Sequence, residues 1–230
     1  MKIGIFGTGV VGQTIAEKLV QLGHQVFIGT RDKQATLAKT GKDNFGRPPF
    51  NEWLKNNSKV QLGTYSEAAS FGELLVNATS GTGSIDALKL AGENNLSNKI
   101  LLDISNPLDF SKGMPPTLTI SNTDSLSELI QRTFTKTKVV KSLNTLTAYL
   151  MVNPKLLPEP TNIFLNGNDG GAKSEIKKLL TTFGWNENDI IDMGDISTAR
   201  GTEQLLPIWV RLWGALGTPI FNFKIVVGNN

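Results

Sequence analysis

A glycine-rich segment near the start of the chain constrains the fold more than any other feature. It reads Gly7-Thr8-Gly9-Val10-Val11-Gly12 and lies between an apolar run over residues 3–6 and an amphipathic stretch over residues 10–22. This order is typical of a buried strand that turns tightly into a helix. The glycines allow the turn, and the helix N-terminus then offers backbone N–H groups and a positive dipole end to a pyrophosphate. The segment therefore predicts the first βαβ unit of a nucleotide-binding sheet.

Short apolar runs and amphipathic stretches alternate along the first two thirds of the chain. Strands are expected over residues 2–6, 25–28, 60–62, 73–78, 99–104 and 138–142. Helices are expected over 10–22, 32–39, 84–91 and 125–132, while 40–58 is a polar insertion with a short helix around Trp53. This alternation predicts an α/β fold with a doubly wound parallel sheet of the Rossmann type.

A proline-rich segment divides the chain into two predicted domains. Residues 151–160 hold three prolines, which mark a boundary. We assign 1–150 to the nucleotide-binding domain and 151–230 to a small C-terminal α/β domain. The second part is expected to contain strands over 163–165 and 190–193 and helices over 170–183 and 197–216, with the last helix kinked or split at Pro207. A weakly alternating run over 221–227 is expected to close the sheet as an edge strand.

Composition excludes several classes of function. The chain has no cysteine and one histidine, His24, so it can build neither a sulfur-based zinc site, nor a thiolate nucleophile, nor a histidine metal cluster. The net charge of +3 is small and dispersed, which argues against nucleic acid as a partner. The apolar run over 3–6 is too short for a signal peptide or a membrane span. We expect a cytoplasmic protein with no metal site and no membrane partner.

The end of the second predicted strand indicates which nucleotide binds. Many dinucleotide sites carry a carboxylate there for the ribose hydroxyl, but this chain has Thr30 and Arg31. A hydroxyl and a guanidinium suit a 2′-phosphate, so the pair favours NADP(H) over NAD(H). The alternative is an arginine that only faces solvent or pairs with Asp32, which could then serve NAD.

The ends of the later strands carry small polar residues. Thr79, Ser80 and Gly81 follow the fourth strand and are expected to flank the nicotinamide ribose. Asn106 follows the fifth strand and Asn144 the sixth, where neutral amides could hold the carboxamide or a substrate carbonyl. Asn144 could equally be a turn residue that bonds its own backbone.

Acid–base groups are scarce near these strand ends. His24 falls at the opposite end of the sheet, and neither Tyr65 nor Tyr149 has a lysine four residues later. Lys141 and Asn144 are the only weak catalytic candidates, and Lys141 is expected to point from its strand into solvent. Hydride exchange with a flavin-like ring needs mainly stacking and orientation, with protons supplied by water. The scarcity of acids therefore favours a flavin-type acceptor.

The chain resembles the NADPH-dependent reductases of coenzyme F-420 nearly from end to end. The resemblance is carried by short motifs in a shared order, namely residues 3–12, 23–26, 29–31, 103–108, 139–145, 167–169 and 192–195, with Ala199, Arg200 and Glu203. Asn144 stands where some members have histidine, and the 40–58 insertion departs from the family pattern.

The resemblance implies a homodimer in which the C-terminal part covers a cleft, where a deazaflavin stacks on the nicotinamide. Thr8 to Val11 would hold the pyrophosphate, and Thr30 with Arg31 the 2′-phosphate. Thr79 and Ser80 would lie by the nicotinamide ribose, and the Ala148 backbone by the carboxamide. The family's further lysine at the 2′-phosphate has no match at the same offset, and Lys33 is the candidate replacement.

The sequence leads to one main hypothesis and leaves rivals open. The main hypothesis is an oxidoreductase that moves a hydride between NADP(H) and a flavin or deazaflavin. The rivals are an NADPH-dependent reductase of a small carbonyl or imine, and a regulatory protein that binds NADP without turnover. Arg200 and Glu203 are expected to form a structural ion pair at helical spacing. A stripe of Trp209, Leu212, Trp213 and Leu216 could be core, dimer surface or the roof of an aromatic ligand.

Overall fold

A six-stranded parallel sheet forms the centre of the protein. The computed structural model describes residues 1–43 and 46–228. The sheet has the order β3-β2-β1-β4-β5-β8, and every neighbouring pair is parallel. Its strands are β1 (Lys2–Phe6), β2 (Gln25–Thr30), β3 (Val60–Thr64), β4 (Leu74–Asn77), β5 (Ile100–Asp103) and β8 (Lys138–Lys141). The strand order reverses between β1 and β4, which is where doubly wound sheets bind their ligands. The predicted α/β Rossmann-type fold is confirmed.

Helices cover both faces of this sheet. They are α1 (Val10–Gln21), α2 (Lys33–Ala38), α3 (Phe50–Asn56), α4 (Tyr65–Phe71), α5 (Gly81–Ala91), α6 (Glu93–Leu96) and α7 (Leu126–Thr133). Asp32, Thr64 and Ser125 begin α2, α4 and α7, because each side chain accepts a bond from the backbone N–H three residues later. One boundary differs from the prediction: α5 begins at Gly81 rather than at residue 84, so the small-residue segment 81–83 is the first turn of the helix.

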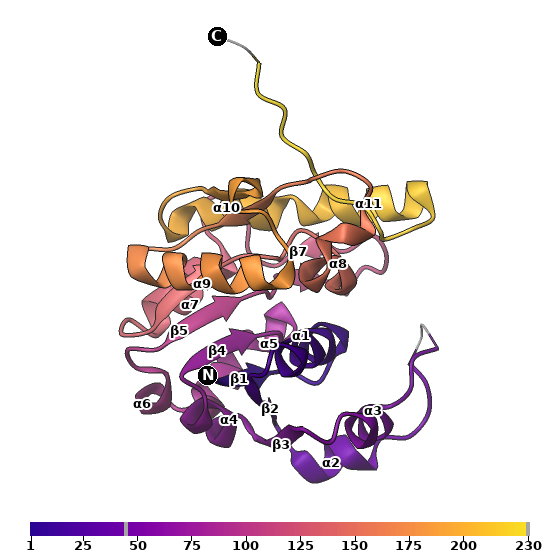
Figure 1. Cartoon of the computed structure of the whole chain (residues 1–230), viewed down its shortest axis with the longest axis vertical. Coiled ribbons are helices and arrows are strands. Elements are labelled where there is room, and N and C mark those ends of the chain that lie inside the picture. Colours follow the sequence, from indigo (N-terminus) through magenta and orange to yellow (C-terminus); the bar gives the residue numbers. More distant parts are fainter. Residues whose placement is uncertain (44–45, 229–230) are drawn as a thin grey trace.

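The C-terminal part lies along the β8 edge of the sheet, as the orange and yellow ribbon in Figure 1 shows. It contains α8 (Ala148–Val152), β9 (Ile163–Leu165), α9 (Gly170–Phe183), β10 (Ile190–Asp192), α10 (Ala199–Gln204) and α11 (Leu206–Leu216), with three short 3-10 turns, η1 (Pro154–Leu156), η2 (Glu187–Asp189) and η3 (Ile196–Thr198). Strands β9 and β10 pair in parallel. Pro207 occupies the first turn of α11, where its missing N–H costs nothing, and the predicted split therefore falls at Leu205.

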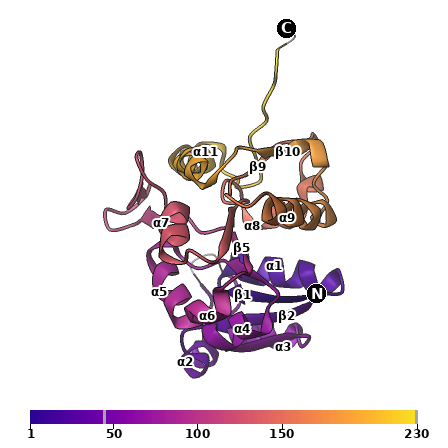
Figure 2. The same cartoon turned by 90° about the vertical axis from the view of Figure 1, so that its left-hand side faces the viewer.

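Two features were absent from the sequence prediction or placed wrongly by it. Strands β6 (Leu108–Asp109) and β7 (Thr117–Leu118) form a small antiparallel hairpin. The run 221–227 is not an edge strand: Phe223 accepts one backbone bond from Asn162, 2.9 Å, and the chain then leads away from the body (Figure 2). Val226 and Val227 are more than four-fifths exposed, so no strand lies beside them for the tail to pair with.

Alternating strand residues build two hydrophobic layers. One cluster contains Ile5 and Ile15, and it continues without a break into Leu165, Ile176 and Trp185 of the C-terminal part. The second lies on the opposite sheet face and is built by residues that include Phe6, Leu75, Leu88, Leu101 and Ile130. Both faces of the sheet are thus buried, as a parallel sheet requires. Among the described residues, no helix combines the length and apolarity needed to cross a bilayer.

Candidate functional site

The three glycines of the turn after β1 differ in whether the protein has room for a side chain at their positions. Gly7 has φ of +116°, and a Cβ there would lie 2.6 Å from the carbonyl oxygen of Ala78. A Cβ on Gly12 would clash with the carbonyl oxygen of Gly7. Gly9 has no protein atom within 4 Å of where its Cβ would lie. Packing therefore demands two of the glycines, while the third leaves open space in which a pyrophosphate can approach the backbone.

The first turn of α1 has no side-chain cap. Gly9 is the N-cap residue, and the only side-chain bond at the turn runs from Gln13 Nε2 to the carbonyl oxygen of Thr8, 2.8 Å. The N–H groups of the first turn, which begins at Val10 and Val11, stay available to an anion, and the helix dipole adds a partial positive charge. A cavity of about 390 Å³ opens beside this turn. The residues present fit the diphosphate of a dinucleotide.

The end of β2 presents a guanidinium rather than a carboxylate. Thr30 is buried, and its Oγ1 lies 2.8 Å from Oγ1 of Thr36. Arg31 is exposed and has no hydrogen bond or ion pair with any other residue that the structure describes. The Asp32 carboxylate accepts a bond from the backbone N–H of Ala35, 2.9 Å, and so caps α2. The alternative in which Asp32 pairs with Arg31 is not what the structure shows.

Two further predicted residues lie near this end of the sheet. Lys33 is the first residue of α2. The hydrogen bonds that Glu67 accepts from Thr64 are the main cause of its lowered pKa, and the positive charge of Lys33 makes a smaller contribution. Burial raises the pKa of Tyr65, and the positive charge of Arg31 partly offsets this shift. Arg31 and Lys33 therefore lie on the side of β2 that faces the start of α4.

After β4, the Thr79 side chain is bonded within the protein, while the Ser80 side chain is exposed to solvent. The hydroxyl of Thr79 donates to Asn77 Oδ1, 2.7 Å, and lies 2.8 Å from Oγ of Ser84. Ser80 is exposed and begins α5 without using its side chain as a cap. Gly81 packs so closely on the carbonyl of Asn106 that any Cβ would clash with it. The start of α5 therefore touches the segment that follows β5.

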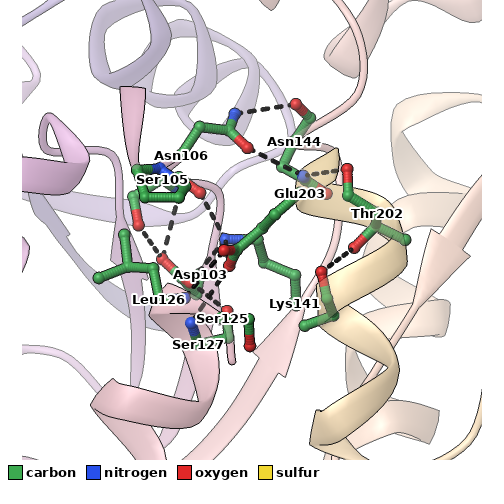
Figure 3. Close-up of polar contacts among 12 residues, drawn as sticks. Asp103, Ser105, Asn106, Ser125, Leu126, Ser127, Lys141, Asn144, Thr202 and Glu203 are labelled. Carbon is green, nitrogen blue, oxygen red and sulfur yellow. Dashed lines mark hydrogen bonds and ion pairs between the residues drawn. The ribbon is translucent and has the colours of Figure 1, made fainter. Parts of the chain in front are cut away.

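A reciprocal amide pair joins the ends of β5 and β8. Asn106 Nδ2 donates to the carbonyl oxygen of Asn144, 2.9 Å, while Asn144 Nδ2 donates to Asn106 Oδ1, 3.0 Å (Figure 3). Asn144 Nδ2 also donates to the carbonyl oxygen of Thr202 in α10, 3.1 Å. The structure thus brings Gly81, Asn106 and Asn144 together. Both amide hydrogens of Asn144 are occupied within the protein, so the side chain acts as a brace between three elements.

Leu143 places this brace with an unusual backbone conformation. Its φ is +61° although its side chain is large and almost fully buried. A non-glycine residue in this region costs about 1–3 kcal/mol, and such residues gather at binding and active sites. The left-handed turn directs the chain from β8 toward Thr145 and α8, where Ala148 is the buried first residue.

Lys141 is buried, which corrects the expectation that it points into solvent. Its Nζ lies 2.9 Å from Asp103 Oδ2 and 2.9 Å from Glu203 Oε1, and it also donates to the carbonyl oxygen of Ser105. Complete burial disfavours the charge, but the carboxylates of Asp103 and Glu203 outweigh this and raise the pKa of Lys141. All three ammonium hydrogens have internal acceptors, so Lys141 has no proton to offer a substrate.

The two carboxylates around Lys141 are also fully occupied. Asp103 accepts from Asn77 Nδ2, 2.9 Å, from the Ser105 hydroxyl, 2.6 Å, and from the Ser127 hydroxyl, 2.5 Å. Glu203 accepts from the backbone N–H groups of Leu126, 2.8 Å, and Ser127, 3.2 Å, at the start of α7. Figure 3 shows Asp103 and Glu203 beside Lys141, with Ser127 and Leu126 of α7 bonded to these carboxylates.

Glu203 therefore does not pair with Arg200, contrary to the expectation from their spacing. Arg200 instead forms a bidentate pair with Glu128 of α7, with distances of 2.9 and 2.6 Å. Both residues still link α10 to α7, but Glu203 does so from the interior and Arg200 from the surface. The (i, i+3) spacing identified two charged residues correctly and their partners wrongly, because each had a closer partner on another element.

The aromatic stripe of α11 is only partly buried. Trp209 is buried and stacks on Phe221 with ring centres 5.4 Å apart, and Trp213 lies 5.6 Å away at a tilt. Leu216, at the other end of the stripe, is more than half exposed. Packing against Phe221 explains why Trp209 is buried.

Several residues of this site were not found from the sequence. Asn77, Asp103, Ser127 and Glu203 form the buried network around Lys141, but only Asp103 and Glu203 belonged to noted motifs, and without this role. A charged residue that ends a buried parallel strand is the signal that was available, because such a charge needs a partner. Glu203, one of the two carboxylate partners of Lys141, lies 62 residues later in the chain, in α10, and local spacing could not predict this pairing.

The open glycine turn, the guanidinium at the end of β2 and the strand ends at the switch point define a dinucleotide-binding oxidoreductase. Comparisons with known proteins support this class. The family described as "NADP oxidoreductase coenzyme F420-dependent" matches residues 2–107. A crystal structure from Arthrobacter sp. FB24, of a protein named "putative F420 dependent NADP-reductase", is 55% identical with a TM-score of 0.93, and the match covers 99% of this chain and 100% of that one. The chain belongs to the F420-dependent NADP oxidoreductase family.

More distant relatives agree on the fold. Metalloreductase STEAP3 of Rattus norvegicus is 26% identical over 213 residues, which is 90% of this chain but only 38% of that protein. An imine reductase of Myxococcus stipitatus, solved with NADP+, is 13% identical with a TM-score of 0.60, covering 94% of this chain and 63% of that one. The family and its 55% identical relative identify an enzyme, an NADP-dependent oxidoreductase.

Proposed function

We propose that the protein transfers a hydride between NADP(H) and the ring of a flavin or of a deazaflavin of the coenzyme F420 type. The observation that carries this proposal is that no Lys, His or Tyr side chain among the described residues at the ends of β4, β5 and β8 is free to donate a proton. Among the described residues there, Lys141 and Asn144 have every N–H bonded internally. Reduction of a ketone or imine needs a positioned acid, whereas a stacked ring needs orientation and can take its proton from water.

His24 cannot supply the missing acid. Its Nδ1 lies 3.4 Å from the N-terminal amine of Met1, at the opposite end of the sheet from the glycine turn. Burial, with a smaller contribution from the N-terminal charge, lowers the pKa of His24. The imidazole is therefore remote from the site and mostly neutral at pH 7.

The proposed cofactor position follows the strand ends in order. Thr8 to Val11 would bind the pyrophosphate, Thr30 and Arg31 the 2′-phosphate with Lys33 nearby, and Thr79 with Ser80 the nicotinamide ribose. The Ala148 backbone would bind the carboxamide, since it is the first residue of α8 and no side chain caps that helix. Bound NADPH supplies the hydride, and these residues fix the plane against which the acceptor ring stacks.

The reaction balances with one proton from solvent. A hydride leaves C4 of the reduced nicotinamide with two electrons and adds to the acceptor ring, and water supplies the proton that completes its reduction. The protein contributes orientation through the Asn106–Asn144 brace and the left-handed turn at Leu143. No covalent bond to the protein is required.

A comparison of acceptors tests this proposal. NADPH oxidation would be measured by absorbance with F420, FMN, FAD, a cyclic imine, a small ketone and a ferric chelate, the last because the rat relative is named a metalloreductase. We expect turnover with F420 or a flavin, a primary isotope effect with C4-deuterated NADPH, and little solvent isotope effect. Faster reduction of the imine or ketone, or NADPH binding with no turnover on any acceptor, would overturn the proposal.

A further inference from the structure

The cavity beside the glycine turn has a second wall that the family motifs do not account for. One wall consists of Thr8, Gly9, Val10 and Gln13. The other comes from the end of α2 and the insertion that follows, and it is lined by Thr36, Lys39, Thr40, Gly41, Lys42, Asp43, Arg47, Pro48, Pro49 and Phe50. The cavity of about 390 Å³ thus lies between a phosphate-binding turn and the part of the chain that departs from the family pattern.

The charges on this second wall favour an anion. Lys39, Lys42 and Arg47 are positive, and Asp43 is the single acid in the lining. Asp43 is already bonded to Arg47, with 2.6 Å between Oδ2 and Nε. Neither Lys39 nor Lys42 forms a hydrogen bond or ion pair with another described residue. Two ammonium groups therefore border a cavity whose opposite wall is an uncapped helix N-terminus.

The wall is anchored to the body of the protein at several points. Asn51 Nδ2 donates to the carbonyl oxygen of Leu37, 2.9 Å, and the Trp53 indole donates to Glu17 of α1. Phe50 and Trp53 are buried in the same hydrophobic cluster as the helix α1. The bond between Asn51 and Leu37 holds the end of α2, from which Lys39 extends, against α3.

We propose that Lys39 and Lys42 bind the diphosphate of the dinucleotide, across the cavity from the glycine turn. The lining contains the turn residues that face a diphosphate and contains neither Thr30 nor Arg31, so the lysines serve the diphosphate and not the 2′-phosphate. The insertion is then a second phosphate-binding wall that supplements the helix dipole with full charges. This inference rests on the NADP(H) binding of the proposed function.

Loss of a contact to the diphosphate should weaken NADPH and NADH binding alike, whereas loss of a contact to the 2′-phosphate should weaken only NADPH binding. Lys39→Ala and Lys42→Ala should each weaken NADPH and NADH binding by the same factor, about fivefold, as expected for a solvent-exposed ion pair near the upper end of its range. The double variant should lose about 25-fold for both nucleotides if the two contacts are independent. Its affinity should also depend less on ionic strength than that of the wild type. Lys55→Ala is the matched control, since Lys55 is exposed on the neighbouring α3 but does not line the cavity.

Dissociation constants from titration calorimetry with NADPH and NADH decide between the outcomes. An equal loss for both nucleotides, with Lys55→Ala unchanged, supports the proposal. Unchanged affinity in the double variant, or a loss confined to NADPH, overturns it, and the second result would move the lysines to the 2′-phosphate. Failure of the acceptor assignment would leave these constants unaffected, because binding is measured without an acceptor.

Discussion

Removal of the Lys141 charge should test how far the buried network supports the fold. In Lys141→Met the side-chain length is kept and the ammonium is lost. Asp103 and Glu203 each lie 2.9 Å from Nζ, so their carboxylates are within about 6 Å of one another, and both are almost fully buried. Attraction of about 6 kcal/mol per pair at an effective dielectric constant near 20 is opposed by the cost of burying three ions. Breaking such a network typically costs about 3–5 kcal/mol.

That loss is a large part of an ordinary folding free energy of about 5–15 kcal/mol. Urea unfolding would be followed by the fluorescence of the four tryptophans. The raised pKa of Lys141 means that its contribution to the wild type is complete below the usual lysine pKa and disappears only as pH rises through the folded value. A measurement near pH 7 therefore records the whole effect.

A second variant provides the control for simple loss of packing. Glu203→Gln removes one negative charge and keeps one acceptor oxygen, for either the N–H of Leu126 or that of Ser127, which bond to different oxygens of the glutamate. Combined with Lys141→Met, it should be less destabilising than the sum of the single changes by about 1–3 kcal/mol, because Asp103 then no longer faces a second unpaired carboxylate. Additive effects of the two substitutions would refute the electrostatic account.

Three further predictions concern the cofactor site and its surroundings. Gly9→Ala should leave the free energy of unfolding within about 0.5 kcal/mol of wild type yet weaken NADPH binding at least tenfold. Gly12→Ala should lower the free energy of unfolding by about 2 kcal/mol or more, because a Cβ clashes with protein atoms at Gly12 and not at Gly9. Equal stability of the two variants would contradict this difference. Arg31→Ala should weaken NADPH binding by about 10- to 100-fold and leave NADH unchanged, and an equal loss for both nucleotides would show that Arg31 does not contact the 2′-phosphate. The single imidazole should titrate below its usual pKa in proton NMR, and His24→Gln should keep the pH profile of turnover, because His24 is far from the site.

Local patterns predicted the elements of the fold well. The glycine turn, the helix over Gly170–Phe183 and the break before Pro207 follow from short-range rules of turn and helix formation, and all three are present. The tail over 221–227 was wrong because alternation alone does not supply a partner strand. The start of α5 was misplaced because Gly81 and Gly83, which look like loop residues, fit only as the first turn of a helix packed against Asn106.

The site was predictable in position but not in its bonding. Strand ends at a switch point gather regardless of sequence detail, so Gly81, Asn106 and Asn144 could be expected to meet. The direction of Lys141 could not be predicted, since a lysine at the end of a strand is ordinarily solvated and the two acids that bury it come from β5 and α10. The roles of the fifteen predicted cofactor residues, the homodimer and the cytoplasmic location remain predictions.

The connection of α10 to the sheet has a consequence for how the molecule unfolds. Thr202 and Glu203 are neighbours in the chain, and one holds Asn144 while the other neutralises Lys141. The hydrophobic cluster around Ile5 also continues to Ile190. The nucleotide-binding half therefore lacks its own full set of internal partners, and Lys141 at the end of its last strand takes one of its two carboxylate partners from α10. We expect such a chain to unfold as a single cooperative unit, so that a change in α10 also weakens nucleotide binding in the other half.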